Sequence, residues 1–152
     1  VPMIVVDPDE KSKRGVVSDA LIEAVDMVPT FLDAVGIEIP DHIIEGRSIL
    51  PLLRGEQSAI REAVFSELDF AIYPTARKLG LKPNDARMVM CRTARWKLVH
   101  FGPGLPPQLF DMQEDPLELH DRGRDDGAIY RAARDDLYQC KFPGRSMGSL
   151  TN

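Results

Sequence analysis

The clearest alternation of apolar and polar residues lies between residues 87 and 115, in three short segments separated by turn residues. A period of two indicates a half-buried strand, because successive side chains of a strand point to opposite faces. The pattern predicts strands at Arg87–Arg92, Arg95–Phe101 and Gln108–Met112. The Thr93-Ala94 link is short, so we expect the first two strands to pair as a hairpin. These residues predict a small antiparallel sheet.

Flanking segments complete this predicted sheet. Ala63–Leu68 is expected to form another strand, and apolar positions within Ile129–Cys140 mark one face of a helix that would pack on the sheet. Asp115 fits an N-cap, with Pro116 at the first helical position and Glu118 at the third, so we expect a helix to begin there.

The first half of the chain shows two helices with a proline in the first turn. With Asp26 as N-cap, Pro29 falls in the first turn, where backbone N–H groups have no partner within the helix, so the proline is tolerated. We therefore expect a helix over Met27–Val35. Ser48 is expected to cap a second, shorter helix that ends at Gly55. The apolar side of the first helix is expected to be buried and consists of Phe31, Leu32 and Val35.

Two stretches ahead of these helices are interpreted as strands. Met3–Val6 is a continuous apolar run ended by Pro8, which is typical of an interior strand buried on both faces. It is either an edge strand of a small sheet or a late strand of a larger sheet whose other strands precede Val1; we expect the second, which makes this chain the C-terminal piece of a longer one. Val16–Val25 fits a helix face or a strand, and its β-branched start favours a strand.

Charge, apolar run length and cysteine count argue against several classes of partner and structure. The formal net charge of −5 argues against binding to nucleic acid or to an anionic membrane surface. No apolar run reaches the roughly 18 residues that a membrane-spanning helix needs. Cys91 and Cys140 are too few for a disulfide framework, so we expect both to be thiols.

The residues by themselves assemble no reactive centre. Cys91 and Arg95 have the spacing of a formylglycine motif, C-x-(P/A)-x-R, but Thr93 stands where proline or alanine is required, so we expect a core thiol. The three histidines, at positions 42, 100 and 120, lack the spacing of a metal site. There is also no glycine-rich phosphate loop.

Six segments, taken in their order along the chain, resemble landmarks of one family. They are VPMIVVDP, AVDMVPTFLDAVGIEIP, EGRSILPLLRGE, SELDF, RTARWKLVHF and PQLFDMQEDPLELHD. In this order they resemble the C-terminal part of the sulfatase family of the alkaline-phosphatase superfamily. A further segment, FAIYPTARKLGLKPNDARM, is most similar to the branch of phosphonate monoester hydrolases and arylsulfatases.

The resemblance implies an α/β fold that is α+β within this chain. Residues 1–62 would supply the last strand and helices of a large mixed alkaline-phosphatase-like sheet. Residues 63–141 would form a small C-terminal antiparallel sheet packed by a helix, and 142–152 a flexible tail.

The resemblance also implies a hydrolase of sulfate or phosphonate/phosphate esters that uses a formylglycine and a divalent metal (Ca, Mn or Mg) in its full-length form. Those groups lie upstream in the family, so no catalytic or metal-binding residue is assigned to this chain, which is expected to be inactive alone. Tyr73 and Arg77 are the candidates for the substrate cleft. The alternative is a stand-alone, non-catalytic binding or interaction module derived from the same domain.

The expected partner of the parent protein is a small anionic ester, with self-association through a surface that a missing domain would leave exposed. Relatives occur in both cytoplasm and periplasm, and the cytoplasm is slightly favoured.

Overall fold

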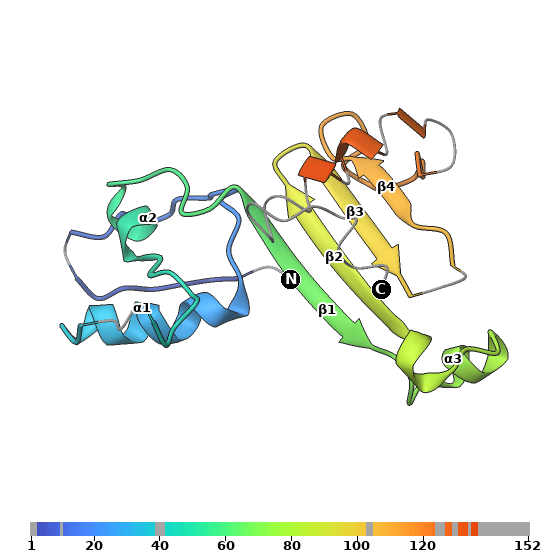
Figure 1. Ribbon diagram of the computed structural model, residues 1–152. Coiled ribbons are helices and arrows are strands. Elements are labelled where there is room, and N and C mark those ends of the chain that lie inside the picture. Colours follow the sequence, from blue (N-terminus) through green and yellow to red (C-terminus); the bar gives the residue numbers. More distant parts are fainter. Residues whose placement is uncertain are drawn as a thin grey trace. The chain divides into compact units, whose positions relative to one another are not determined.

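Figure 1 shows the computed structural model of the chain. The structure describes residues 3–9, 11–38, 42–102, 105–123, 127–128, 131–133 and 135–136. The chain divides into two compact units, Val1–Glu62 and Ala63–Asn152. No helix within the described residues is long and apolar enough to cross a membrane.

The described residues of the first unit contain three short helical elements. The 3-10 turn η1 (Ala24–Asp26) leads directly into α1 (Met27–Ala34), and α2 (Leu50–Arg54) follows after a loop. Pro29 lies in the first turn of α1, and Gly36 just after its end has a left-handed backbone with φ of 74°. Both helices predicted for this half of the chain are confirmed. The short second helix has Ile49 rather than Ser48 at its N-cap position.

Neither strand that was expected in this unit forms. The sheet of the described residues has four strands, and all of them belong to the second unit. Met3–Val6 pairs with none of them, and Ile4 is 93% exposed. Val16–Val25 is irregular up to η1, and Val17 is likewise exposed. The predicted strand at Val16–Val25 is wrong, because a β-branched run becomes a strand only beside a hydrogen-bonding neighbour. The expectation that Met3–Val6 is a late strand of a larger sheet stays a prediction, because the strands expected beside it would precede Val1.

The buried side of α1 is also not the one that was predicted. Phe31 and Val35 are 68% and 69% exposed, whereas Pro29 and Thr30 are buried. The Thr30 hydroxyl accepts a hydrogen bond from the backbone N–H of Ile49 at 3.1 Å. This polar contact turns the Thr30 side of the helix toward the following loop. Phe31 and Val35 of the expected stripe stay exposed, and Leu32 is half-buried.

The second unit is built on a four-stranded antiparallel sheet in the order β1-β2-β3-β4. Its strands are β1 (Ala63–Asp69), β2 (Arg87–Thr93), β3 (Trp96–Phe101) and β4 (Gln108–Asp111). Each strand pairs with its neighbour in sequence, so the sheet is a meander, and the predicted strands and hairpin are confirmed.

The core of this unit follows a single row across the sheet. Phe65 lies opposite Cys91, Cys91 opposite Leu98, and Leu98 opposite Leu109. The last three are buried together with Ala133, and Phe65 packs against them. The prediction that Cys91 is a core thiol is therefore confirmed by its burial, at 5% exposure.

Ala133 belongs to a helical stretch at residues 127–128, 131–133 and 135–136. These residues agree with the predicted packing helix over Ile129–Cys140. The other positions of that helix, Cys140 among them, and the predicted tail at 142–152 lie outside the described residues.

A long ordered segment joins β1 to β2. This α3 excursion, Phe70–Ala86, contains α3 (Pro74–Lys78) and the 3-10 turn η2 (Pro83–Asp85), and it projects beyond the ends of the two strands (Figure 1). The backbone N–H of Phe70 donates to the carbonyl of Ala86 at 2.8 Å, which closes the base of the excursion. Its own small core consists of Phe70, Ala76 and Ala86.

The segment after β4 is a turn rather than the predicted helix. The Asp115 carboxylate accepts hydrogen bonds from the N–H groups of Leu119 at 3.0 Å and His120 at 2.7 Å. A helix N-cap would instead bind the second or third amide after it. Glu118 has a φ of 57°, which is incompatible with a continuing right-handed helix. The predicted helix start at Asp115 is therefore wrong, because its carboxylate binds the fourth and fifth amides after it.

Candidate functional site

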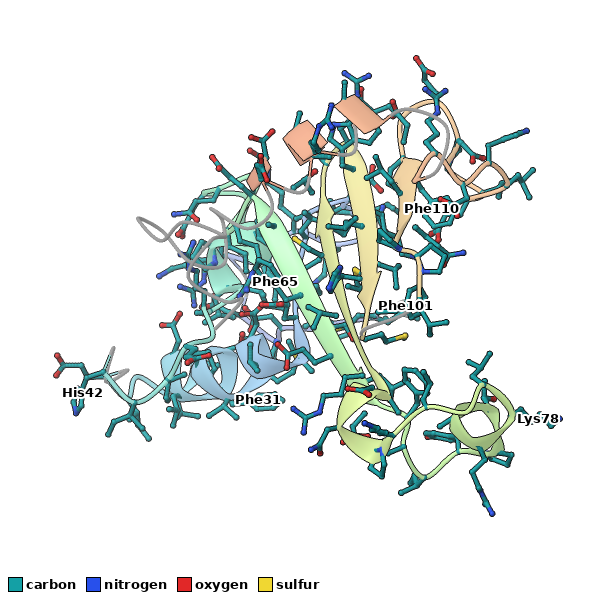
Figure 2. All side chains as sticks on the ribbon, turned by 45° about the vertical axis from the view of Figure 1, so that its right-hand side comes forward. Phe31, His42, Phe65, Lys78, Phe101 and Phe110 are labelled. Atoms are coloured by element: carbon teal, nitrogen blue, oxygen red, sulfur yellow. The ribbon has the colours of Figure 1, made fainter. Side chains whose placement is uncertain are left out.

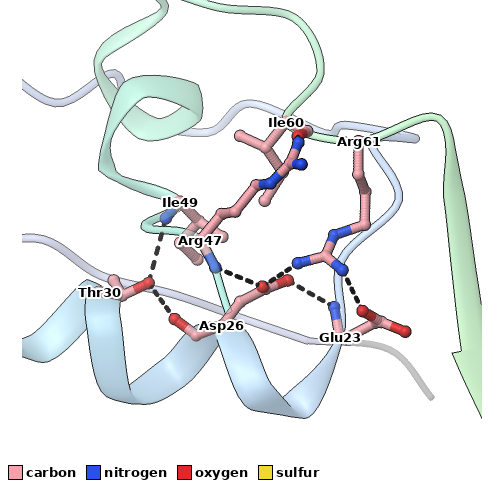
Figure 3. A network of polar contacts seen from close by, with 7 residues as sticks. All are labelled: Glu23, Asp26, Thr30, Arg47, Ile49, Ile60 and Arg61. Atoms are coloured by element: carbon pink, nitrogen blue, oxygen red, sulfur yellow. Dashed lines mark hydrogen bonds and ion pairs between the residues drawn. The ribbon is translucent and has the colours of Figure 1, made fainter. Parts of the chain in front are cut away.

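The family landmark Val-Asp-x-x-Pro-Thr forms a buried polar network around Asp26 (Figure 3). The Asp26 side chain is fully buried. It accepts hydrogen bonds from the backbone N–H of Glu23 at 2.7 Å and that of Arg47 at 2.9 Å. The Arg61 guanidinium forms ion pairs with both Asp26 and Glu23. We call Glu23, Asp26, Thr30, Arg47 and Arg61 the Asp26 network.

The network joins three separate parts of the first unit. The Thr30 hydroxyl donates to the backbone carbonyl of Asp26 at 2.6 Å. Arg47 adds a contact from its guanidinium to the carbonyl of Ile60 at 2.5 Å. Gly46 allows this close approach, because a Cβ at that position would lie 2.0 Å from the carbonyl oxygen of Val25. Residues near 26, 47 and 61 are thereby held together.

This network is suited to holding the fold rather than to chemistry. Both oxygens of Asp26 already accept hydrogen bonds, and one of them also meets a guanidinium. A carboxylate that is buried and fully engaged in this way is poorly placed to take a proton from a substrate or to bind a metal. The Asp26 landmark therefore identifies a structural clamp.

The second family landmark, Leu-Phe-Asp, behaves in the same way. Asp111 is fully buried and accepts hydrogen bonds from Arg95 Nε at 3.2 Å and Nη2 at 3.1 Å. Burial alone would raise the pKa of Asp111, but the hydrogen bonds from Arg95 and from the N–H groups of Gln113 and Glu114 outweigh it, and the pKa is lowered. Arg95 also lies over the Trp96 ring, 4.9 Å from its centroid. Asp111 is thus a charged anchor for the turn after β4.

The sequence-predicted cleft residues, Tyr73 and Arg77, both lie on the α3 excursion. Tyr73 is the N-cap residue of α3 and is 48% exposed, and Arg77 is an exposed residue of its last turn. Tyr73 precedes the helix with an extended backbone, and Arg77 lies within it. Lys78 follows and points outward from α3, away from the sheet (Figure 2). The structure therefore brings both residues to one exposed segment, the α3 excursion.

The described residues do not fit a divalent metal. Within them, no group of three or more His, Cys, Asp or Glu side chains could hold such an ion. The carboxylates of Asp7, Asp111 and Asp115 are taken up by local hydrogen bonds, which lower the pKa of each. No reaction step through a metal is assigned to this chain.

Sequence reasoning missed Arg61 and Arg47 as partners of Asp26. They lie 35 and 21 residues from it along the chain, so no local spacing connects them. The signal that was present is the apolar setting of a lone aspartate ahead of Pro29, since a carboxylate in such a place needs a partner.

Comparisons with known proteins place these features in a family. The family model described as N-sulphoglucosamine sulphohydrolase, C-terminal, matches residues 1–137. The chain is 31% identical over 123 residues to the multifunctional alkaline phosphatase superfamily protein PehA of Trinickia caryophylli, which covers 78% of this chain and 24% of PehA.

Solved structures give the same result. The phosphonate monoester hydrolase of Agrobacterium radiobacter matches with a TM-score of 0.65 and 34% identity, over 80% of this chain and 25% of that one. A protein solved in complex with its substrate, D-glucosamine-2-N,6-O-disulfate, matches with a TM-score of 0.55 and 29% identity, over 75% of this chain and 24% of that one.

The chain therefore spans about a quarter of the length of the relatives it matches. The expected resemblance and the expected mixed fold with a small antiparallel sheet are both confirmed. The chain belongs to the family of N-sulphoglucosamine sulphohydrolase C-terminal domains, among the sulfatases of the alkaline-phosphatase superfamily.

Proposed function

We propose that this chain is the C-terminal part of a hydrolase of sulfate or phosphonate/phosphate esters, in which it serves as scaffold and as one wall of the substrate cleft. The observation that carries the proposal is the match to hydrolases of this superfamily, over about four fifths of this chain and about a quarter of each relative. The fully engaged carboxylates of the two landmark motifs support a scaffold role.

In this proposal the reactive groups precede Val1. A formylglycine nucleophile and a divalent metal (Ca, Mn or Mg) would lie there, and such a metal would supply charge neutralisation of an anionic ester. This chain contributes Tyr73 and Arg77, an aromatic ring and a permanent cation suited to an aryl or sugar ester that carries negative charge. A small anionic ester is thus the proposed substrate of the whole protein.

The exposed apolar face of α1 supports a covering partner domain. Val28, Phe31 and Val35 follow the spacing of one helix face and are 56%, 68% and 69% exposed. A patch of this kind marks an interaction surface. We expect the preceding part of the hydrolase to cover it, and the chain alone to self-associate through it.

Replacing Phe31 tests this surface. Phe31→Asp should shift the isolated chain from associated species toward monomer in sedimentation velocity, with little change in its thermal melting. Leu117→Asp, at an apolar position of the second unit that is 74% exposed, is the matched control and should leave association unchanged. An unaltered sedimentation profile for Phe31→Asp would contradict the proposed covering surface.

Turnover tests the proposed function itself. The longer reading frame that contains this chain should hydrolyse an aryl sulfate or an aryl phosphonate in the presence of Mn²⁺ or Ca²⁺, and the 152-residue chain should not. Activity of the chain alone that is lost in Cys91→Ala would overturn the scaffold role. A longer frame without a formylglycine motif, together with a monomeric chain that melts cooperatively, would favour the stand-alone binding module.

A further inference from the structure

We propose that residues 121–123 close the outer edge of β4, and that without them this edge pairs with the same edge of a second copy of the chain. Strand β4 is the last in the sheet order of the described residues (Figure 1). An outer strand whose backbone groups are unpaired is a template for association with another chain. We call residues 121–123 the edge strap. The inference goes beyond the proposed function, because it concerns the association of the small sheet and involves no ester.

The backbone groups that β4 turns outward at its centre are already bonded to the edge strap. The N–H of Leu109 donates to the carboxylate of Asp121 at 3.1 Å. The carbonyl of Leu109 accepts a hydrogen bond from the backbone N–H of Arg122 at 2.8 Å. An added antiparallel strand would bond to these same two groups. The Asp121 carboxylate therefore takes the place that a carbonyl group of a neighbouring strand would occupy.

The strap and the turn before it also cover the positions on either side of Leu109. Pro107 and Asp111 lie two residues away from Leu109, so their backbone groups face the same edge. Pro107 has no N–H to offer, and a Cβ at Gly123 would lie 2.6 Å from the Pro107 carbonyl oxygen. The carbonyl of Asp111 accepts from the N–H of Asp115 at 2.7 Å. The edge is thus closed along β4 rather than at one point.

A tight reversal of the chain returns the strap to this edge. Glu118 has a φ of 57°, in the left-handed region that residues other than glycine seldom adopt. Lys97 of β3 pairs with Glu118 at 2.5 Å, and the Arg122 side chain pairs with Glu114 at 3.1 Å. An unfavourable backbone conformation persists only where its surroundings hold it. The reversal at Glu118 is therefore explained by the position that it gives to Asp121.

A second copy of the chain fits the edge once the strap is released. Two antiparallel edges that are related by a two-fold axis offer each other the same row of donors and acceptors. The Leu109 side chain is fully buried in the core row with Cys91 and Leu98. Release of the strap therefore exposes the backbone groups of Leu109, while its side chain still holds β4 in the sheet.

Hydrogen exchange tests the closed edge on the 152-residue chain. Asp121→Ala removes the acceptor of the Leu109 N–H, whereas Asp121→Asn keeps a side-chain oxygen there. At low protein concentration, exchange at Leu109 should be at least about tenfold faster in Asp121→Ala, and within about threefold of the parent in Asp121→Asn. Amides of β2 and β3 are the internal reference and should stay within about threefold of the parent. Asp19→Ala is the matched control, because it removes the same charge from an exposed loop of the first unit.

Sedimentation velocity tests the second copy. Phe31→Asp is added to every protein, so that the apolar face of α1 contributes equally little. The sedimentation coefficient of Asp121→Ala should then rise with concentration more steeply than that of Asp121→Asn or Asp19→Ala. Exchange at Leu109 in Asp121→Ala should slow again at the concentrations where association occurs, because its N–H is then bonded to the other copy.

Three results would overturn the inference. Exchange at Leu109 that stays at the parent rate in Asp121→Ala would show that the strap does not close the edge. Equal acceleration at the β2 and β3 amides would give Asp121 a general stabilising role only. Fast exchange at Leu109 without added association would exclude the second copy. If Asp121→Ala does not fold, Gly123→Ala displaces the strap by crowding the Pro107 carbonyl and should give the same selective exchange and association.

Discussion

The Asp26 network and the α3 excursion use the same residue types in opposite ways. In the network, the Arg61 side chain is 12% exposed and meets two carboxylates of its own unit. In the excursion, Arg77 and Lys78 are exposed and have no ion-pair partner among the described residues. Buried and paired cations hold chain segments together, whereas exposed and unpaired ones remain available to a ligand. The comparison separates the residues that maintain this fold from those that could recognise a substrate.

The largest effect should come from breaking the Asp26 network. Arg61→Ala leaves Asp26 buried without its counterion, and removal of one partner from a buried ion pair costs about 3–5 kcal/mol. Urea denaturation of the first unit measures this loss. Arg54→Ala is the control, because Arg54 and Asp9 are partly exposed and 3.6 Å apart, and it should cost at most about 1 kcal/mol. Similar losses of unfolding free energy in the two variants would show that the buried ion pair stabilises the fold no more than the exposed one.

A smaller effect is expected from crowding the same network. Gly46→Ala places a Cβ against the carbonyl of Val25, so the backbone must shift at a cost of about 1–3 kcal/mol. Gly127→Ala meets no atom within 4 Å and lies in a helical stretch, where alanine should stabilise by about 0.5–1 kcal/mol. Opposite signs in thermal melting of the two variants are the expected result, and a harmless Gly46→Ala would show that the loop can relax.

The pH dependence of stability should test the role of Asp111, the buried aspartate of Leu-Phe-Asp. Since the folded pKa of Asp111 is lowered, its carboxylate stabilises the fold above the unfolded pKa of about 3.9 and loses this effect as the pH falls through the folded value. Asp111→Asn should lose on the order of 1 kcal/mol at pH 7 and show a flatter decline of stability below about pH 4. Parallel pH profiles of the two proteins would exclude Asp111 as a source of the acid dependence.

The smallest effect should be that of the excursion's cations on stability. Replacing Arg77, Lys78 and Lys82 by glutamine removes no contact of the described core, so each substitution should change the free energy of unfolding by no more than about 0.5 kcal/mol. Chemical denaturation of the triple variant checks this. A large loss would give these side chains a structural role and place them with Arg61.

Sequence predicted the sheet well because its signals are local. Alternation within β2 and β3 fixes which residues share a face, and the short Thr93-Ala94 link fixes which strands pair. Cys91 and Leu98 consequently meet in the core, as their faces required.

The errors arise where the outcome depends on distant residues. The predicted stripe of α1 is not covered within this chain, because the contact of Thr30 with Ile49 turns the other side of the helix toward the following loop. Met3–Val6 has the composition of a strand, and its place in a larger sheet stays a prediction. The candidate site divides in the same way: the exposure of Tyr73 and Arg77 could be expected from their place in a long excursion, whereas the carboxylates around Arg61 could not.

Cys91 is buried in the row from Phe65 to Leu109, so the reactivity of its thiol can be used to measure local unfolding of the sheet. A thiol reagent can modify Cys91 only when the strands on either side of it separate, because the side chain is 5% exposed. With Cys140 replaced by serine, the labelling rate divided by that of an unstructured thiol gives the fraction of molecules in which the meander has come apart. That ratio would measure unfolding of the second unit separately from unfolding of the first.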